Sequence, residues 1–512
     1  MTLGAGKGGV DSGSQGFLRF RAIALLLSMA FVSLGLPVAY AASEPPLPAG
    51  LGETSSTSSS EPALPAGLGG ASAAEEPSLP TGLGDSSPTG QTESAPSLPT
   101  GLGGDGEDES VEMAQTDSGG WQLPQGLSGF LEGRIGARLQ NVEGYDRTTL
   151  EEIRLRTEYA RTLGPVRGRL AFDLIAGKPD EESVDLQSGE GWLDLREAWL
   201  LARPGDFIDI KAGRQIATWG TGDLLFINDL FPKDWISFLL GRDEDYLKAP
   251  FDGVRGTIFS DFANLDLIVG IPFAPDRFVD GDDLAFSNPG GPARLENPDI
   301  PDRPDLYSRL YRTIGSAEVA GYLYDGFWKS PGGFSTTGRA IFPRLAVYGA
   351  SVRGAGLGGI LSFETGYYDS LEDRRGTDPF IKNSEWRFLL GHDREILPKL
   401  NLGLQYYVEW LQDYDDYRET LPPIVEPRDE WRQVLTLRLT QLLLRDDLTL
   451  SLFTFYSPTD QDFYLRPVAS WKINDVWRIS GGLNLFGGES DTTFFGQFED
   501  NSNGYLALRA TW

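Results

Sequence analysis

The chain ends in Gly504-Tyr-Leu-Ala-Leu-Arg-Ala-Thr-Trp512, and this stretch decides how the rest of the sequence is interpreted. Leu506, Leu508 and Ala510 alternate with the residues between them, and a period of two places each set on one face of a β-strand. A half-apolar last strand is typical of a transmembrane β-barrel, because that strand must pair with the first to leave no edge in lipid. An edge strand of a soluble β domain is the alternative.

The same ending resembles the terminal strand of Gram-negative outer-membrane barrels. In those proteins the final aromatic residue is part of the signal that the barrel-assembly machinery reads. The resemblance implies that Leu508 and Trp512 form an assembly signal here and that this machinery is a partner.

The composition excludes several classes of function. The 512 residues carry a net charge of −30, which argues against a nucleic-acid partner. The absence of cysteine excludes disulfides and thiolate metal sites, and a single histidine removes most histidine-based chemistry. We therefore expect no metal site, no cofactor and no enzyme activity.

Residues 1–42 have the pattern of a signal peptide. Arg19 and Arg21 precede an apolar run at 22–36, and Ala39-Tyr40-Ala41 fits a cleavage site. A membrane anchor is the alternative. After residue 42 no apolar stretch reaches the roughly 18 residues of a spanning helix.

Residues 43–120 are predicted to be a disordered acidic tail, because Pro, Gly and Ser dominate and apolar residues are few. A Leu-Pro-x-Gly-Leu motif recurs in it, and a fifth copy lies at Leu123 just before the first strand. The copies in the tail begin at Leu47, Leu64, Leu79 and Leu98. Several weak motifs on a flexible chain suit a periplasmic partner that binds by avidity; a duplicated linker without a partner is the alternative.

Residues 121–512 are predicted to form an all-β, antiparallel transmembrane barrel in outer-membrane lipid. Apolar and charged residues alternate over segments of about ten residues, the length that a tilted strand needs to cross a bilayer. Short turns alternate with long connections, and the parity requires an inward strand at Leu306–Arg312. The count is then eighteen strands, with sixteen as the fallback, and both termini lie in the periplasm.

The predicted lumen-facing positions are rich in arginine, a residue whose planar fork binds carboxylates and phosphates. Acidic residues share these faces, so pairing across strands is the alternative to a path for anions. The candidate selectivity residues are Arg134, Arg138, Arg154, Arg156, Arg167, Arg169, Arg214, Arg438, Arg478 and Arg509.

The connection at 224–250 is too apolar for an ordinary loop in water. We expect it to fold into the barrel mouth with a short helix and to narrow the lumen; packing on a neighbouring subunit is the alternative. The candidate constriction residues are Trp219, Asp223, Phe226, Phe231 and Trp235.

Several short motifs resemble a family of Gram-negative outer-membrane barrels similar to the alginate-export porins. They are Gly213-Arg214-Gln215, Trp219-Gly220 with Asp223, the turn Phe231–Asp234, and Phe342–Ser351. The resemblance spans roughly residues 127–512 and implies an eighteen-strand barrel that passes a polymer or small solutes.

The sequence thus predicts a passive outer-membrane channel for small or polymeric solutes, possibly anionic ones. Two alternatives stay open. One is a structural barrel that tethers a periplasmic partner through the tail, and the other is an outer-membrane hydrolase that uses His392 beside Asp393.

Overall fold

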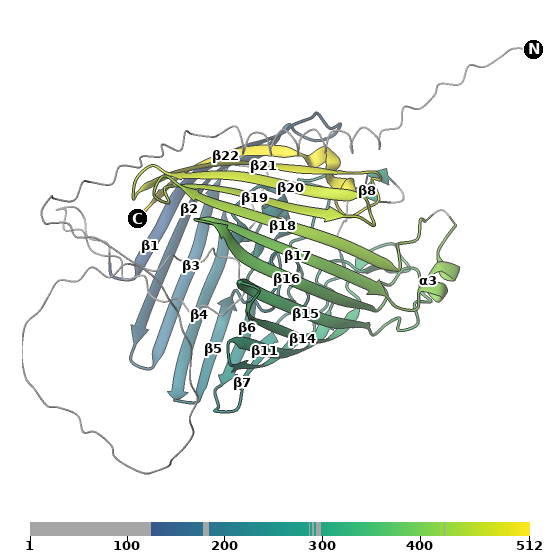
Figure 1. The fold of residues 1–512 in the computed structure, drawn as a ribbon, viewed down its shortest axis with the longest axis horizontal. Helices are drawn as coiled ribbons and strands as arrows, with labels where there is room; N and C mark the ends of the chain where they lie inside the picture. The colour runs from purple at the N-terminus through teal and green to yellow at the C-terminus, as the bar shows by residue number, and fades with distance from the viewer. Residues whose placement is uncertain (1–123, 178–183, 286, 289–290, 293–297, 424) are drawn as a thin grey trace, which may run out of the picture. The chain divides into compact units, whose positions relative to one another are not determined.

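A computed structural model describes residues 124–512 apart from 178–183, 286, 289–290, 293–297 and 424 (Figure 1). The predicted signal peptide at 1–42 and the predicted tail at 43–120 lie outside the described residues.

Eighteen antiparallel strands form one closed sheet, which confirms the predicted barrel and makes the fallback of sixteen strands wrong. Each strand pairs with the next along the chain, and the last pairs with the first. The barrel strands are β1 (Leu127–Arg138), β2 (Thr148–Leu163), β3 (Val166–Ala176), β4 (Leu193–Gly205), β5 (Ile208–Gln215), β6 (Phe251–Ile258), β7 (Asn264–Gly270), β10 (Asp305–Ile314), β11 (Ala317–Phe327), β14 (Arg344–Gly356), β15 (Gly359–Ser370), β16 (Glu385–Leu397), β17 (Leu400–Leu411), β18 (Trp431–Leu443), β19 (Leu448–Ser457), β20 (Asp462–Lys472), β21 (Trp477–Gly488) and β22 (Asn503–Thr511).

Smaller elements lie in the connections. Two hairpins, β8 (Ser287–Asn288) with β9 (Gly291–Pro292) and β12 (Gly333–Phe334) with β13 (Ala340–Ile341), stay outside the barrel sheet. The described helices are α2 (Trp235–Leu240), α3 (Tyr414–Thr420) and the 3-10 turns η1 (Glu244–Leu247) and η2 (Gly496–Asn501). None of the described helices is long and apolar enough to cross a membrane.

The seam between β1 and β22 closes the sheet. Gly133 lies opposite Leu508 in its register. The pairing continues to the last residue, where the backbone of Trp512 exchanges two hydrogen bonds with that of Gly129, at 3.2 and 3.1 Å. No backbone edge is therefore left along the seam, as the sequence of the last strand predicts.

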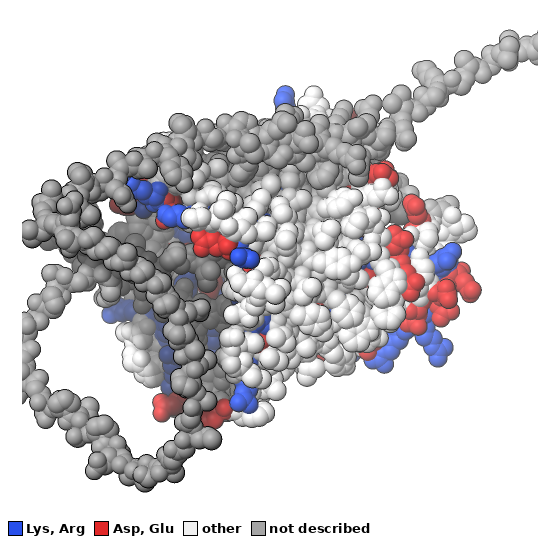
Figure 2. Space-filling model, viewed as in Figure 1, with Lys and Arg blue, Asp and Glu red and all other residues white. Residues whose placement is uncertain are grey.

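The barrel has its apolar side chains on the outside and its charged side chains on the inside, the reverse of a soluble domain. On β1, Leu131 and Ile135 are 45 % and 60 % exposed on the outside, whereas Glu132 and Arg134 are 3 % and 2 % exposed on the inside. Figure 2 shows uncharged residues over the middle of the strands, with charged residues gathered toward the ends. An apolar band around a charged interior suits the hydrocarbon of a bilayer.

The connections alternate as predicted, with small shifts. The carboxyl terminus lies at the end with the short turns, and the longer connections, including the one with α3, lie at the opposite end (Figure 1). We call the second end external. The turn predicted at 354–356 lies instead at Leu357-Gly358, where both residues have positive φ, 52° and 74°. A two-residue hairpin turn of this kind requires positive φ at both of its central positions, and here Leu357 and Gly358 are the two residues that adopt it.

We predict that Leu131→Arg destabilises the barrel in a phospholipid bilayer by about 2–4 kcal/mol, since it places a charge on the lipid-facing band. The measurement is the folding free energy from urea titration in vesicles. Phe380→Arg is the matched control, because Phe380 is at least as exposed as Leu131, 55 % against 45 %, but lies in the external connection 371–384. Equal effects of the two substitutions would contradict a lipid-facing band.

Candidate functional site

Residues 216–250, here called the inner loop, connect β5 to β6 and fold inside the barrel. Its helix α2 begins where the Asp234 side chain accepts a hydrogen bond from the backbone N–H of Ser237, at 2.7 Å. The helix ends at Gly241, whose φ of 93° favours glycine. The predicted short helix of this connection is therefore present.

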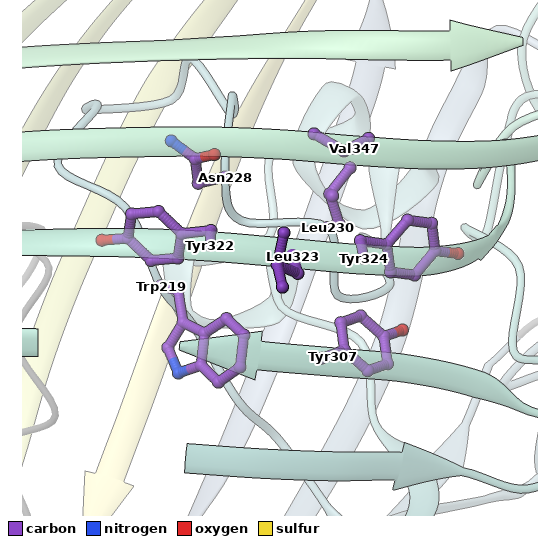
Figure 3. Close-up of a pocket in the computed structure, with 8 residues that line it drawn as sticks. All are labelled: Trp219, Asn228, Leu230, Tyr307, Tyr322, Leu323, Tyr324 and Val347. Carbon is purple, nitrogen blue, oxygen red and sulfur yellow. The ribbon is translucent and has the colours of Figure 1, made fainter. Parts of the chain in front are cut away.

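One side of the interior is a packed apolar sector. The ring of Phe231 stacks on Tyr307 of β10 with centroids 4.6 Å apart, and Trp219 packs against both rings. Figure 3 shows Trp219 with the tyrosines of β10 and β11 around a cavity of about 10 Å³. Such a cavity holds about one water molecule. No solute path passes through this packed cluster of aromatic rings.

Glu364 of β15 holds the start of the inner loop. One carboxylate oxygen accepts hydrogen bonds from the backbone N–H and the hydroxyl of Thr221, at 2.7 and 3.0 Å. The other accepts from the backbone N–H and side-chain amide of Asn228, at 2.7 and 2.9 Å. This fully buried carboxylate thus satisfies four donors of the loop.

A second charged contact of the inner loop is made with β18, further along the barrel wall. Arg438 of β18 binds Asp223 with two donors, at 2.5 and 3.0 Å, in a bidentate pair. A further nitrogen of Arg438 donates to Glu244 at 3.2 Å, so one arginine joins the start of the loop to its tip.

The tip of the inner loop, Arg242–Asp245, meets the opposite part of the wall. Asp243 accepts from Arg134 of β1 at 2.8 Å and also pairs with Arg509 of β22. Arg242 binds Glu152 of β2, with the shortest distance 2.8 Å. The loop therefore reaches from β15 and β18 to the seam strands, across the barrel interior.

Tyr246 follows the tip and is buried between charges. Its hydroxyl donates to Asp173 of β3 at 2.8 Å and accepts from Arg156 at 3.0 Å. The guanidinium groups of Arg154, Arg156 and Arg196 lie 4.5, 5.2 and 5.0 Å from its ring centre. These contacts are cation–π interactions, which strengthen where water is excluded.

Several inner-loop residues have shifted pKa values, among them Asp243 and Tyr246. Burial alone would raise the pKa of Asp243, but the guanidinium groups of Arg509 and Arg134 outweigh it and lower the pKa to about 2. For Tyr246, burial raises the pKa to about 12 although the neighbouring arginines act against it. Asp243 is therefore charged and Tyr246 neutral at pH 7.

Solvent reaches the tip of the loop. Asp245 is exposed, although its backbone carbonyl accepts a hydrogen bond at 3.2 Å from Arg196, a buried residue of the β4 wall. The side chains of Asp243 and Glu244 are about one third exposed, at 36 % and 32 %. The charged sector beside the tip therefore contains open space inside the barrel.

The structure brings half of the predicted lumen arginines together around the inner loop. Each of these five contacts the loop, and each is also paired with an acidic residue of the wall or of the loop. They are Arg134, Arg154, Arg156, Arg438 and Arg509.

The other five predicted arginines lie elsewhere. Arg138 donates to the carbonyls of Asp146 and Asp283 near the external end. Arg169 pairs with Glu158 and Glu197, and Arg214 pairs with Asp252. The remaining two are near the end with the short turns, and they are Arg167 and Arg478.

The predicted constriction residues all belong to the inner loop, and their side chains pack against other parts of the loop or against the barrel wall. Trp219 and Phe231 lie in the apolar sector, and Asp223 binds Arg438. The rings of Phe226 and Trp235 pack on each other at 6.0 Å. These residues hold the loop in place, whereas its solvent-exposed part is the tip, which the sequence analysis did not select.

Sequence reasoning missed several residues of the site. Glu364, Arg196 and Arg466 lie on strands whose alternation would have placed them in the lumen. Arg242 and Asp243 have no such signal, because nothing in a loop sequence shows which of its charges will meet a wall residue 90 or 109 positions away.

The hydrolase alternative finds no support in the geometry. Neighbouring residues of a strand point to opposite faces, so His392 of β16 shares the outward face with the exposed Leu390, and Asp393 faces inward. Among the described residues, no three His, Asp or Glu side chains gather as a metal site would require.

The known proteins that this chain matches are all solved structures. No family model and no curated protein matches the chain. OccD3 (OpdP) of Pseudomonas aeruginosa is 13 % identical, covers 76 % of this chain and 91 % of its own, and has a TM-score of 0.45. OccAB4 of Acinetobacter baumannii is 9 % identical, with coverages of 75 % and 97 % and a TM-score of 0.45. The outer membrane channel DcaP of Acinetobacter baumannii is 11 % identical, with coverages of 75 % and 96 % and a TM-score of 0.37. None of these matches tests the likeness to alginate-export porins, which stays a prediction.

We predict that Glu364→Ala loosens the inner loop, because two buried backbone N–H groups lose their acceptor at a cost of about 1–3 kcal/mol each. The expected result is a lower urea midpoint of unfolding and faster amide exchange at residues 221–228. In Asp299→Ala, the control, an exposed pair with Arg339 is lost and less than about 1 kcal/mol is expected. A midpoint as high as that of the control would show that Glu364 does not hold the loop.

The depressed pKa of Asp243 predicts how the tip responds to acid. Its pairing with arginine stabilises the fold fully above the ordinary pKa of 3.8 and is lost as the pH falls through about 2. Amide exchange at residues 241–247, corrected for its intrinsic pH dependence, should therefore stay constant from pH 7 to about pH 4. Asp243→Asn should exchange faster throughout this range. Release of the wild-type tip near pH 5 would contradict this assignment.

Proposed function

We propose that this protein is a passive channel of the outer membrane for small solutes. The observation that carries the proposal is the exposed tip of the inner loop. Asp245 is open to solvent, yet its neighbours Arg242, Asp243 and Tyr246 bind wall residues on β1, β2 and β3. Water-accessible space beside a loop that crosses the lumen is the arrangement of a narrowed pore.

The membrane placement follows from the outer surface. Leu323 of β11 and Leu390 of β16 are exposed like Leu131 and Ile135 of β1, so the apolar face continues around the sheet. Such a surface would aggregate in water, and lipid removes that cost. Diffusion through the lumen of such a barrel needs no energy source.

The path runs through the charged sector, past the exposed side of the tip. The apolar sector is closely packed, and the cavity beside Trp219 has a volume of only about 10 Å³. The inner loop occupies part of the lumen and binds the wall on several strands, which supports small solutes over polymers. The arginines of this sector are paired, so their number alone gives no support to a preference for anions.

A cysteine placed at the tip tests the path, because the chain has no cysteine of its own. We predict that Asp245→Cys forms open channels in a planar bilayer and that a bulky methanethiosulfonate reagent then reduces their conductance by at least about half. The reason is that the modified side chain occupies the narrow space beside the tip.

Thr336→Cys is the matched control, since Thr336 is equally exposed but lies in the external connection between β12 and β13. Its modification should leave the conductance unchanged. A folded barrel that never conducts, or an Asp245→Cys channel that is fully modified without a loss of current, would rule out this path.

A further inference from the structure

We infer that Asp245 makes the narrow part of the channel prefer cations and neutral solutes to anions. The inference rests on the proposed channel function and adds the class of solute to it. It reverses the expectation that the arginine-rich sequence raises. Three observations carry it: the pairing of the arginines at the tip, the unpaired carboxylate of Asp245, and the charge of the external mouth.

The arginines near the tip are compensated. Arg134 and Arg509 share Glu132 and Asp243, and Arg438 is held between Asp223 and Glu244. Arg134 is almost completely buried, and the side chains of Arg438 and Arg509 are only about one fifth exposed. A passing ion therefore meets neutral pairs at these positions rather than free guanidinium groups.

The carboxylate of Asp245 is the exposed charge that remains. It forms no ion pair within the described part of the chain. Desolvation at the tip and the neighbouring carboxylates of Asp243 and Glu244 raise its pKa, and the charges of Lys248 and Arg509 act against this rise. The carboxylates beside it, Asp243 and Glu244, are partly exposed as well. The surface that the tip presents to the open space is therefore negative.

The external mouth has the same sign. Leaving the inner loop aside, the described residues of the external connections hold 25 Asp and Glu against 10 Lys and Arg. Figure 2 shows acidic residues gathered at the end that carries α3. A negative mouth raises the local concentration of cations before they reach the tip and lowers that of anions.

The test is the reversal potential of single channels of the full-length protein in a potassium chloride gradient. The wild-type channel should favour potassium over chloride. Asp245→Asn should lower the permeability ratio of potassium to chloride by about two- to fivefold, since the substitution removes one charge that forms no ion pair at the narrow point. Asp245→Lys should lower the ratio further, toward chloride.

Glu419→Gln is the matched control, because it removes the same charge from the exposed surface of α3. It should change the ratio by much less than Asp245→Asn. A wild-type channel that favours chloride, or equal ratios for wild type and Asp245→Asn, would overturn the inference. Both outcomes leave the channel function intact, whereas a folded barrel that carries no current would instead refute that function.

Discussion

The structure depends on the pairing of every backbone N–H and C=O group in the part of the chain that faces lipid. Hydrocarbon offers no hydrogen-bond partner, so an open sheet edge would cost several kcal/mol per group. The seam between β1 and β22 removes that edge, down to the two hydrogen bonds between Trp512 and Gly129. Closure also fixes the parity of each strand. Leu508 then faces outward and Arg509 inward, next to Glu132.

Once the charged faces point inward, they need partners. An arginine buried in the wall would be strongly destabilising without a carboxylate. Arg134 and Arg509 share the single carboxylate of Glu132 within the wall, and Arg438 has no ion pair with a described strand residue. The inner loop supplies the missing groups. Asp243 serves β1 and β22, Asp223 and Glu244 serve β18, and the carbonyl of Lys248 serves Arg196 of β4. The loop is therefore part of the electrostatic structure of the wall as well as a filler of the lumen.

Much of the fold could be predicted from the sequence, because period-two alternation and turn residues act locally. Parity predicts a strand at 306–312, which is β10 in the structure, and the apolar residues of the inner loop predict that it folds inward. Only part of the site could be predicted from the sequence. Alternation shows that Arg134 and Arg438 face the lumen, but not that each meets a carboxylate 109 and 215 positions away. Such pairings depend on the path of one loop across the barrel, which no local pattern contains.

This limit changes the meaning of the arginines. Counted along the sequence, they suggest a positive lumen, since Arg134, Arg154 and Arg509 lie on predicted inward faces. Counted by exposure, the same residues are neutralised by the acids they bind, and the charge that water can reach belongs to the loop tip. The wall therefore determines where the loop lies, and the loop determines which charge a solute meets. If the barrel is the channel proposed above, the residue that structural pairing leaves over sets its selectivity, and we infer that this residue is Asp245.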